Sequence, residues 1–195
     1  SFLKTGDALA DGRFDGATAN PRWFHLAAVD VLNPEGAALA ILGDSITDGY
    51  GVETDSDTRW PDFLARRLQG AGRNMGVANL GIGGNRLLLD GLGPNAFSRL
   101  DRDVLAQSGV THLLLLIGVN DLGTLTRDAP VASEARAAHL AQMLAAYRQI
   151  ALRAREAGMQ VIGGTITPYG ASQYYHPQPA DEATRQAINL WLRTP

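Results

Sequence analysis

Four short apolar segments recur along this sequence, each ended by a glycine or a polar turn and separated from the next by a helical pattern. They cover residues 37–42, 75–80, 112–117 and 160–166. A run that is apolar on both faces is typical of a central parallel strand with helices on each side. Strands that alternate with helices at this spacing predict the α/β class, with an open parallel sheet covered by helices on both faces.

The segments between these strands carry the periodic apolar pattern of amphipathic helices. Helices are expected over residues 58–70, 97–105 and 133–157, and a last helix is expected to begin with Asp181 as its N-cap. The side chains expected to point inward are Trp60, Phe63, Leu64 and Leu68, then Phe97, Leu100, Val104 and Leu105, then Leu140, Met143, Leu144, Tyr147, Ile150 and Ala154, and finally Ala187, Ile188 and Trp191.

The first 36 residues lack this regularity. Residues 1–22 are rich in Gly, Asp and Ala without a sustained period, and residues 23–32 are compatible with one strand. We therefore divide the chain into a tether or remnant of an upstream module at 1–36 and a folded domain at 37–195. The chain begins without Met and ends directly after a helical pattern, so neither end is expected to be a natural terminus.

Composition and charge argue against several classes of function. Seventeen basic and 20 acidic residues give a net charge of −3 without a block of like charge, so no nucleic-acid partner is expected. No apolar run approaches the roughly 18 residues of a membrane span. Without cysteine there is no disulfide, thiolate zinc site or cysteine nucleophile. Lys4 is the only lysine, which argues against a Schiff base or a P-loop.

Three loops at the predicted carboxyl edge of the sheet, where ligands bind in such folds, carry polar or glycine-rich sequence. In the first, residues 43–49 (GDSITDG), Ser45 leads towards a helix, and the N–H groups around it can hold a developing oxyanion. In the second, residues 79–86 (NLGIGGNR), glycines let N–H groups face a ligand. In the third, residues 118–121 (GVND), the amide of Asn120 can donate to an oxyanion.

Each loop also has a simpler interpretation. Taken alone, the three fit a polar turn, a tight strand-to-helix connection, and an Asx turn or helix cap. Two other motifs fit less well. Thr47 stands where the G-x-S-x-G nucleophile elbow needs glycine, and Arg86 stands at the third glycine of the dinucleotide-binding pattern G-x-G-x-x-G.

Taken together and in this order, the three loops resemble those of the SGNH (GDSL-like) hydrolases, in a bacterial branch similar to arylesterases and carbohydrate acetylesterases. The resemblance implies a three-layer α/β/α, flavodoxin-like fold with a parallel sheet over the whole folded domain. It implies an acyl-serine intermediate without a metal or organic cofactor. It also implies a β-rich module upstream, of which residues 1–36 would be the remnant, and export from the cytoplasm.

The resemblance also assigns roles to individual residues. Ser45 resembles the nucleophile, and its backbone N–H resembles one oxyanion donor. Gly84 matches the glycine that supplies a second N–H, and Asn120 matches the side-chain donor. Asp44 and Asp121 would support the loops without transferring protons.

The family supplies its catalytic base from an Asp-x-x-His block, and this chain departs from that pattern. No histidine has an aspartate three residues before it; the four are His25, His112, His139 and His176. Only His176 is expected on a loop at the catalytic edge, as the base, as part of the pocket wall or as a surface residue. We expect the chain to stop before a fifth strand and before the catalytic base. It should then be inactive alone unless His176 or another chain supplies the base. Without the fifth strand it should also expose a sheet edge that is open to association.

The sequence thus predicts a serine esterase, a carboxylic ester hydrolase for short acyl esters, above all acetyl esters, of small molecules or polysaccharides. Two alternatives stay open: a carbohydrate- or acyl-binding fragment without catalysis, and a lysophospholipase or thioesterase. Tyr169, Tyr174 and Tyr175, beside His176, offer aromatic faces that suit a sugar, although loop tyrosines often serve packing alone.

Overall fold

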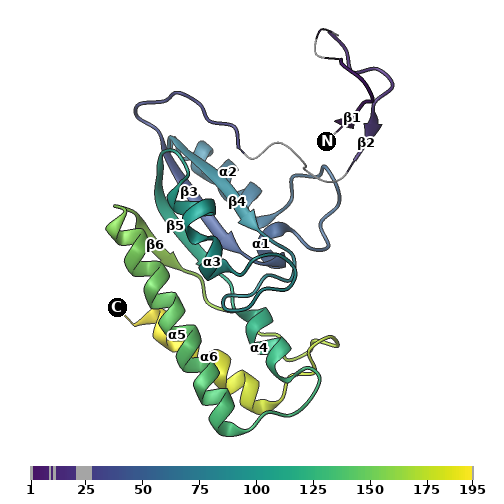
Figure 1. Cartoon of the computed structure of the whole chain (residues 1–195). Helices are drawn as coiled ribbons and strands as arrows, with labels where there is room; N and C mark the ends of the chain where they lie inside the picture. The colour runs from purple at the N-terminus through teal and green to yellow at the C-terminus, as the bar shows by residue number, and fades with distance from the viewer. Residues whose placement is uncertain (1, 9, 11, 21–27, 195) are drawn as a thin grey trace. The chain divides into compact units, whose positions relative to one another are not determined.

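The computed structural model describes residues 2–8, 10, 12–20 and 28–194 (Figure 1). The chain divides into two compact units, Ser1–Asn33 and Pro34–Pro195. In the first unit, β1 (Phe2–Leu3) pairs antiparallel with β2 (Thr18–Ala19). The interpretation of the N-terminal segment as a tether or remnant stays a prediction.

The strand expected over residues 23–32 is wrong for the part that is described. Residues 23–27 lie outside the described residues, and residues 28–32 form neither helix nor strand. Val29, Val31 and Leu32 are all exposed. Apolar and β-branched side chains favour a strand where a pleated, half-buried surface receives them, and these three lack that cover.

The second unit contains the predicted parallel sheet. Its strands are β3 (Ala37–Gly43), β4 (Met75–Gly81), β5 (Val110–Leu116) and β6 (Gln160–Gly163), in the order β4-β3-β5-β6, and every neighbouring pair is parallel. The central position of β3 explains its unbroken apolar run, because both of its faces are covered.

The last strand ends three residues before the expected boundary at Ile166. Ile166 is buried, and its N–H donates to Asn189 Oδ1 at 2.8 Å. Its carbonyl accepts from Arg185 Nη1 at 2.6 Å and from Asn189 Nδ2 at 2.9 Å. The Gly164 N–H still donates to the carbonyl of Leu115 on β5 at 2.8 Å, and by Ile166 the side chains of α6 have replaced the sheet as partners of the backbone.

Helices flank the sheet, which confirms the α/β class predicted from the sequence (Figure 1). They are α1 (Ser45–Asp48), α2 (Trp60–Gly70), α3 (Ala96–Leu100) with the π-helical turn η1 (Asp101–Leu105), α4 (Val119–Thr126), α5 (Ser133–Glu156) and α6 (Pro179–Arg193). Helix α2 packs against β4, whereas α5 packs against β6, α3 and α6. Among the described residues, no helix combines the length and apolarity that crossing a bilayer requires.

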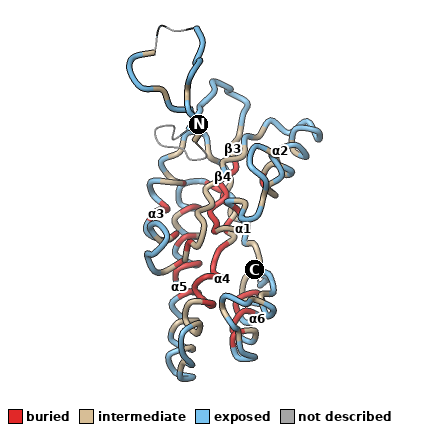
Figure 2. The backbone as a smooth tube through the Cα atoms, turned by 90° about the vertical axis from the view of Figure 1, so that its right-hand side faces the viewer, coloured by how far each residue is buried: buried red, intermediate tan, exposed pale blue. Residues whose placement is uncertain are grey.

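The main core lies between the sheet and the helices α3 and α5. On β3, Ala40 and Leu42 belong to this core, while Leu39 and Ile41 are buried towards the opposite face, as strand alternation requires. Figure 2 shows that buried residues extend from the sheet into α4 and α6. The predicted inner face of α5 is confirmed by its buried residues, which include Met143, Tyr147, Ile150 and Ala154.

Two details of the expected helices are wrong. Phe63 on α2, Phe97 on α3 and Ala187 on α6 are exposed, so none of the three points inward. Asp181 is not the N-cap of α6 but its third residue, where its carboxylate accepts the N–H of the N-cap Gln178 at 2.7 Å. The helix begins three residues earlier than expected, with Gln178 as its N-cap, because Pro179 has the fixed φ angle that suits a first helical position.

Candidate active site

Ser45 is the first residue of α1, directly beyond the end of β3. Asp44 is the N-cap, and its Oδ1 accepts the N–H of Ile46 at 2.9 Å. Two glycines allow backbone segments to approach one another closely here. A Cβ on Gly43 would lie 2.3 Å from Thr47 Oγ1, and a Cβ on Gly81 would lie 2.2 Å from the backbone nitrogen of Asp48. Both positions therefore need glycine so that the ends of β3 and β4 can approach α1.

Gly84 lies in the turn that follows β4. Its φ angle is +70°, a left-handed conformation that favours glycine, and a Cβ there would meet Leu92 Cδ1 at 2.5 Å. Two hydrogen bonds connect β4 and this turn to the segment that carries Ser45. Asn79 Nδ2 donates to the carbonyl of Thr47 at 2.7 Å, and the Ile82 N–H donates to the carbonyl of Gly43 at 3.2 Å.

Asn120 is buried in the first turn of α4, just beyond the end of β5. Its Nδ2 donates to the carbonyl of Asn85 at 2.8 Å, which joins the loops after β4 and β5. A carboxamide nitrogen carries two hydrogens, so one N–H of Asn120 is left for another acceptor.

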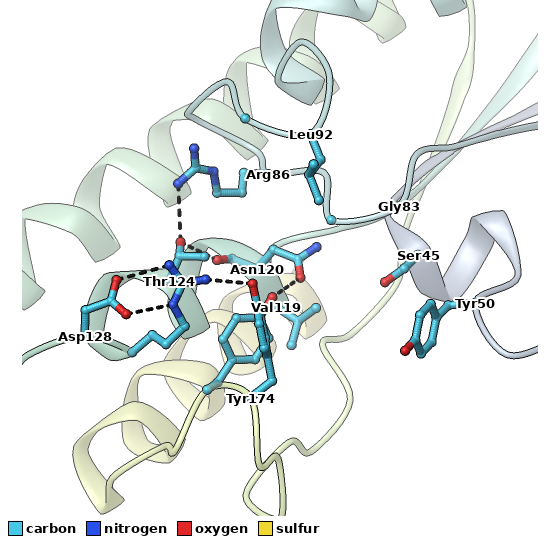
Figure 3. Close-up of a pocket in the computed structure, with 14 residues that line it drawn as sticks. Ser45, Tyr50, Gly83, Arg86, Leu92, Val119, Asn120, Thr124, Asp128 and Tyr174 are labelled. Carbon is cyan, nitrogen blue, oxygen red and sulfur yellow. Dashed lines mark hydrogen bonds and ion pairs between the residues drawn. The ribbon is translucent and has the colours of Figure 1, made fainter.

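A cavity of about 830 Å³ lies at this edge of the sheet, and Ser45, Gly84 and Asn120 all line it (Figure 3). The three loops predicted from the sequence thus converge on one cavity. Its other lining residues are Tyr50, Gly83, Arg86, Gly91, Leu92, Val119, Thr124, Arg127, Asp128, Tyr174 and Tyr175. The volume is in the usual range for small-molecule sites.

Asp44 and Asp121 lie beneath the cavity and are buried. The carboxylate of Asp121 accepts the N–H groups of Leu87 at 2.7 Å and Leu88 at 3.0 Å, so it fixes the loop after β4 from its position on α4. Burial raises the pKa of both aspartates from the ordinary 3.8 to about 6, because it penalises the charged form. Their role as supporting residues stays a prediction.

The raised pKa of Asp44 predicts a measurable pH dependence of stability. The folded state binds this proton more tightly than the unfolded state, so the stabilisation is complete below about pH 4 and is lost as the pH rises to about 6. Asp44→Asn cannot ionise, and it keeps an oxygen for the N-cap. We expect the free energy of unfolding of the variant, relative to the wild type, to rise by up to about 3 kcal/mol from pH 4 to pH 6.5.

Urea unfolding of both proteins at half-unit pH steps measures this difference. Titration of carboxylates that do not interact with Asp44 cancels because both proteins share them. The charge of Asp121 also raises the pKa of Asp44, so any change in the titration of Asp121 is part of the measured difference. A difference that stays constant across pH 4 to 6.5 would show that the buried carboxylate of Asp44 does not hold its proton in the folded state.

The predicted aromatic residues of the loop after β6 do not all line the cavity. Tyr174 and Tyr175 line the cavity. Tyr169 is not among the lining residues; it packs on the core and edge-on against Tyr175, with ring centroids 6.1 Å apart. His176 is exposed, has a left-handed φ angle of +48°, and is also not among the lining residues. No histidine lines the cavity among the described residues.

Arg99, whose guanidinium is buried beside the site, was not among the predicted site residues. It donates to the carbonyls of Gly43 at 3.0 Å and Leu80 at 2.8 Å, which end β3 and β4. It also donates to Asn85 Oδ1 at 3.0 and 3.1 Å and pairs with Asp103 at 3.0 Å. No local signal was available, because Arg99 lies on the side of the predicted helix opposite Phe97, Leu100 and Val104.

The polar inner face of α6 was not predicted either. Asp181, Arg185 and Asn189 are four residues apart, so they share one face of the helix, and all three are buried. Asp181 pairs with Arg136 on α5, while the other two bind the backbone of Ile166. Their spacing was visible in the sequence, but the distant partners that make burial of these groups favourable were not.

A parallel α/β sheet with a serine, a glycine turn and a carboxamide at its carboxyl edge is the architecture of the SGNH hydrolases. The sequence profile of the GDSL-like lipase/acylhydrolase family matches residues 41–194, and the chain belongs to this family. No curated protein sequence matches the chain. Among the described residues, no group of three His, Asp or Glu side chains is placed to hold a metal ion.

Solved structures show the same fold. The SGNH-hydrolase family esterase AlinE4 has a TM-score of 0.57 and 18% identity, over 83% of this chain and 72% of its own. TesA has a TM-score of 0.56 and 24% identity, over 80% and 75%. The acetyl xylan esterase AlAXEase has a TM-score of 0.53 and 16% identity, over 78% and 71%. At these identities the likeness concerns the fold.

Proposed function

We propose that this chain is a carboxylic ester hydrolase with Ser45 as its nucleophile. The observation that carries the proposal is the convergence of Ser45, Gly84 and Asn120 on one cavity. The Ser45 hydroxyl gives its proton to a base, and Oγ bonds to the ester carbonyl carbon. The alcohol leaves with a proton, and water then hydrolyses the acyl-serine to release the acid and restore Ser45.

The oxyanion formed in both steps has three donors. They are the N–H groups of Ser45 and Gly84 and the second N–H of Asn120 Nδ2. Within the described structure, neither backbone N–H has a protein acceptor, and Ser45 stands where the first N–H groups of a helix are unpaired. Fixed donors of this kind stabilise charge that develops in the transition state without having to reorganise.

We further propose short acyl esters of a polar alcohol, such as an acetylated carbohydrate, as the substrate class. Thr124, Arg127 and Asp128 give the cavity a polar end, and Tyr50 and Tyr174 add aromatic surface of the kind that binds sugars. AlAXEase, which shares the fold, is described as an acetyl xylan esterase. A lysophospholipase or thioesterase would instead need a long apolar groove.

A chain-length series tests this substrate class. We expect kcat/KM for p-nitrophenyl esters to fall at least about tenfold from acetate to octanoate, because the extra methylenes meet a polar wall. Acetate release from acetylated xylo-oligosaccharides should be detectable in the same preparation. A preference for octanoate would contradict the short-acyl proposal and favour the lysophospholipase or thioesterase alternative.

One observation favours a second candidate, a binding function without hydrolysis. No histidine lines the cavity among the described residues, and the ring of His176 is exposed. A binding domain would retain acetylated sugars in a saturable manner, as equilibrium dialysis measures, and would release no acetate. Release of acetate that depends on Ser45 would rule this candidate out.

A further inference from the structure

Tyr175 makes a hydrogen bond that links the loop after β6 to the candidate oxyanion donor. Its Oη donates to Oδ1 of Asn120, across 55 positions of the sequence. We propose that Tyr175 is a positioning residue that holds the carboxamide of Asn120 in the orientation that donates to the oxyanion. The inference rests on the proposed function, in which Asn120 supplies that donor.

The ring of Tyr175 is held in place on several sides. Gly123 on α4 leaves room for it, since a Cβ there would lie 2.4 Å from the ring atoms. Tyr169 and Tyr174 contact the ring edge-on, with centroids 6.1 and 4.8 Å away. The Tyr175 N–H donates to Ser172 Oγ at 3.2 Å. A ring fixed in this way presents its hydroxyl to one acceptor.

The contacts of Asn120 define one orientation of its amide. Nδ2 faces the carbonyl of Asn85, which can only accept, and Oδ1 faces the hydroxyl of Tyr175. Burial raises the pKa of Tyr175, so the hydroxyl keeps the proton that it donates. Because the terminal torsion of an asparagine is broad and roughly two-fold, an amide with only one of these partners would sample other angles. The two bonds together direct the remaining N–H into the cavity.

Tyr175 Oη has a role distinct from that of a substrate contact. Its proton is committed to Asn120, so removal of the hydroxyl should slow the chemical step and leave ground-state binding nearly unchanged. We expect Tyr175→Phe to lower kcat roughly 3- to 10-fold, the range for loss of one neutral hydrogen bond, with KM within about twofold of the wild type. In an Asn120→Ala background the same change should have no further effect on kcat.

Tyr169→Phe is the matched control. It also removes one tyrosine hydroxyl in the same aromatic cluster, but that hydroxyl makes no hydrogen bond in the described structure. We expect this variant to keep the wild-type kcat and KM. Equal melting temperatures of the two variants would show that any difference between them is not one of folding.

A second readout does not require turnover. In protein labelled with ¹⁵N-asparagine, the side-chain NH₂ signals of Asn120, assigned by their loss in Asn120→Ala, should shift and exchange faster with solvent in Tyr175→Phe but not in Tyr169→Phe. If the wild type shows no hydrolysis dependent on Ser45, the proposed function fails while this readout still decides the positioning role.

Three results would overturn the positioning role. The first is an unchanged Asn120 signal in Tyr175→Phe. The second is an unchanged kcat with a raised KM, which would make the hydroxyl a substrate contact. The third is a further loss of kcat when Tyr175→Phe is added to Asn120→Ala, because the hydroxyl would then act independently of Asn120.

Discussion

Where His176 or another chain supplies the base, replacement of Ser45 by alanine is expected to lower kcat for p-nitrophenyl acetate by about 10⁴- to 10⁶-fold. The variant keeps Gly84 and Asn120, and so the oxyanion donors, but no atom remains to form the acyl bond. Substrate binding should change little, because the hydroxyl is small and the cavity walls stay in place. Initial rates at several substrate concentrations, corrected for buffer, measure both quantities.

The melting temperature of Ser45→Ala is the control for this assay. Within the described structure the Ser45 hydroxyl makes no hydrogen bond, so Ser45→Ala should melt at the wild-type temperature. Equal rates in the wild type and in Ser45→Ala, both above buffer, would show that another group is the nucleophile. Rates equal to buffer in both proteins would be the result that the binding candidate requires.

His176→Ala belongs in the same series because it asks whether this histidine is the base. A loss as large as that of Ser45→Ala would identify His176 as the proton acceptor and would require its loop to approach the cavity. An unchanged rate would exclude His176 from the reaction and leave it as an exposed loop residue.

Replacement of Arg99 by methionine is expected to lower the free energy of unfolding by about 3–5 kcal/mol. Methionine fills similar space but donates no hydrogen bond. The carbonyls of Gly43 and Leu80 and the side-chain oxygen of Asn85 would lose the donors that this buried group supplies. Urea unfolding at neutral pH, followed by circular dichroism, measures the change.

Arg102→Met is the matched control for this variant. Arg102 also pairs with Asp103, but its side chain is 67% exposed. Exposed ion pairs contribute below about 1 kcal/mol, so this variant should stay close to the wild type. Similar losses in the two variants would mean that the shared partner Asp103, rather than the buried contacts of Arg99, accounts for the effect.

Some of the site could be predicted because its signals are local in the sequence. The serine, glycine and asparagine loops each follow directly after an apolar strand, and parallel strands bring their carboxyl ends to one edge. That rule places Ser45, Gly84 and Asn120 together without knowledge of any side-chain contact. It does not place a residue such as Tyr169, which follows β6 in sequence yet packs on the core instead of lining the cavity.

The sequence by itself determined the α/β class, the four parallel strands and the three loops that line the cavity, because strand and helix patterns depend on residues close together in the chain. Only the tertiary structure decided how the loops are held. Arg99 reaches Gly43 across 56 positions, and Tyr175 reaches Asn120 across 55. A buried polar group is stable only where folding brings it a partner, and the sequence shows the group without showing which distant atom satisfies it.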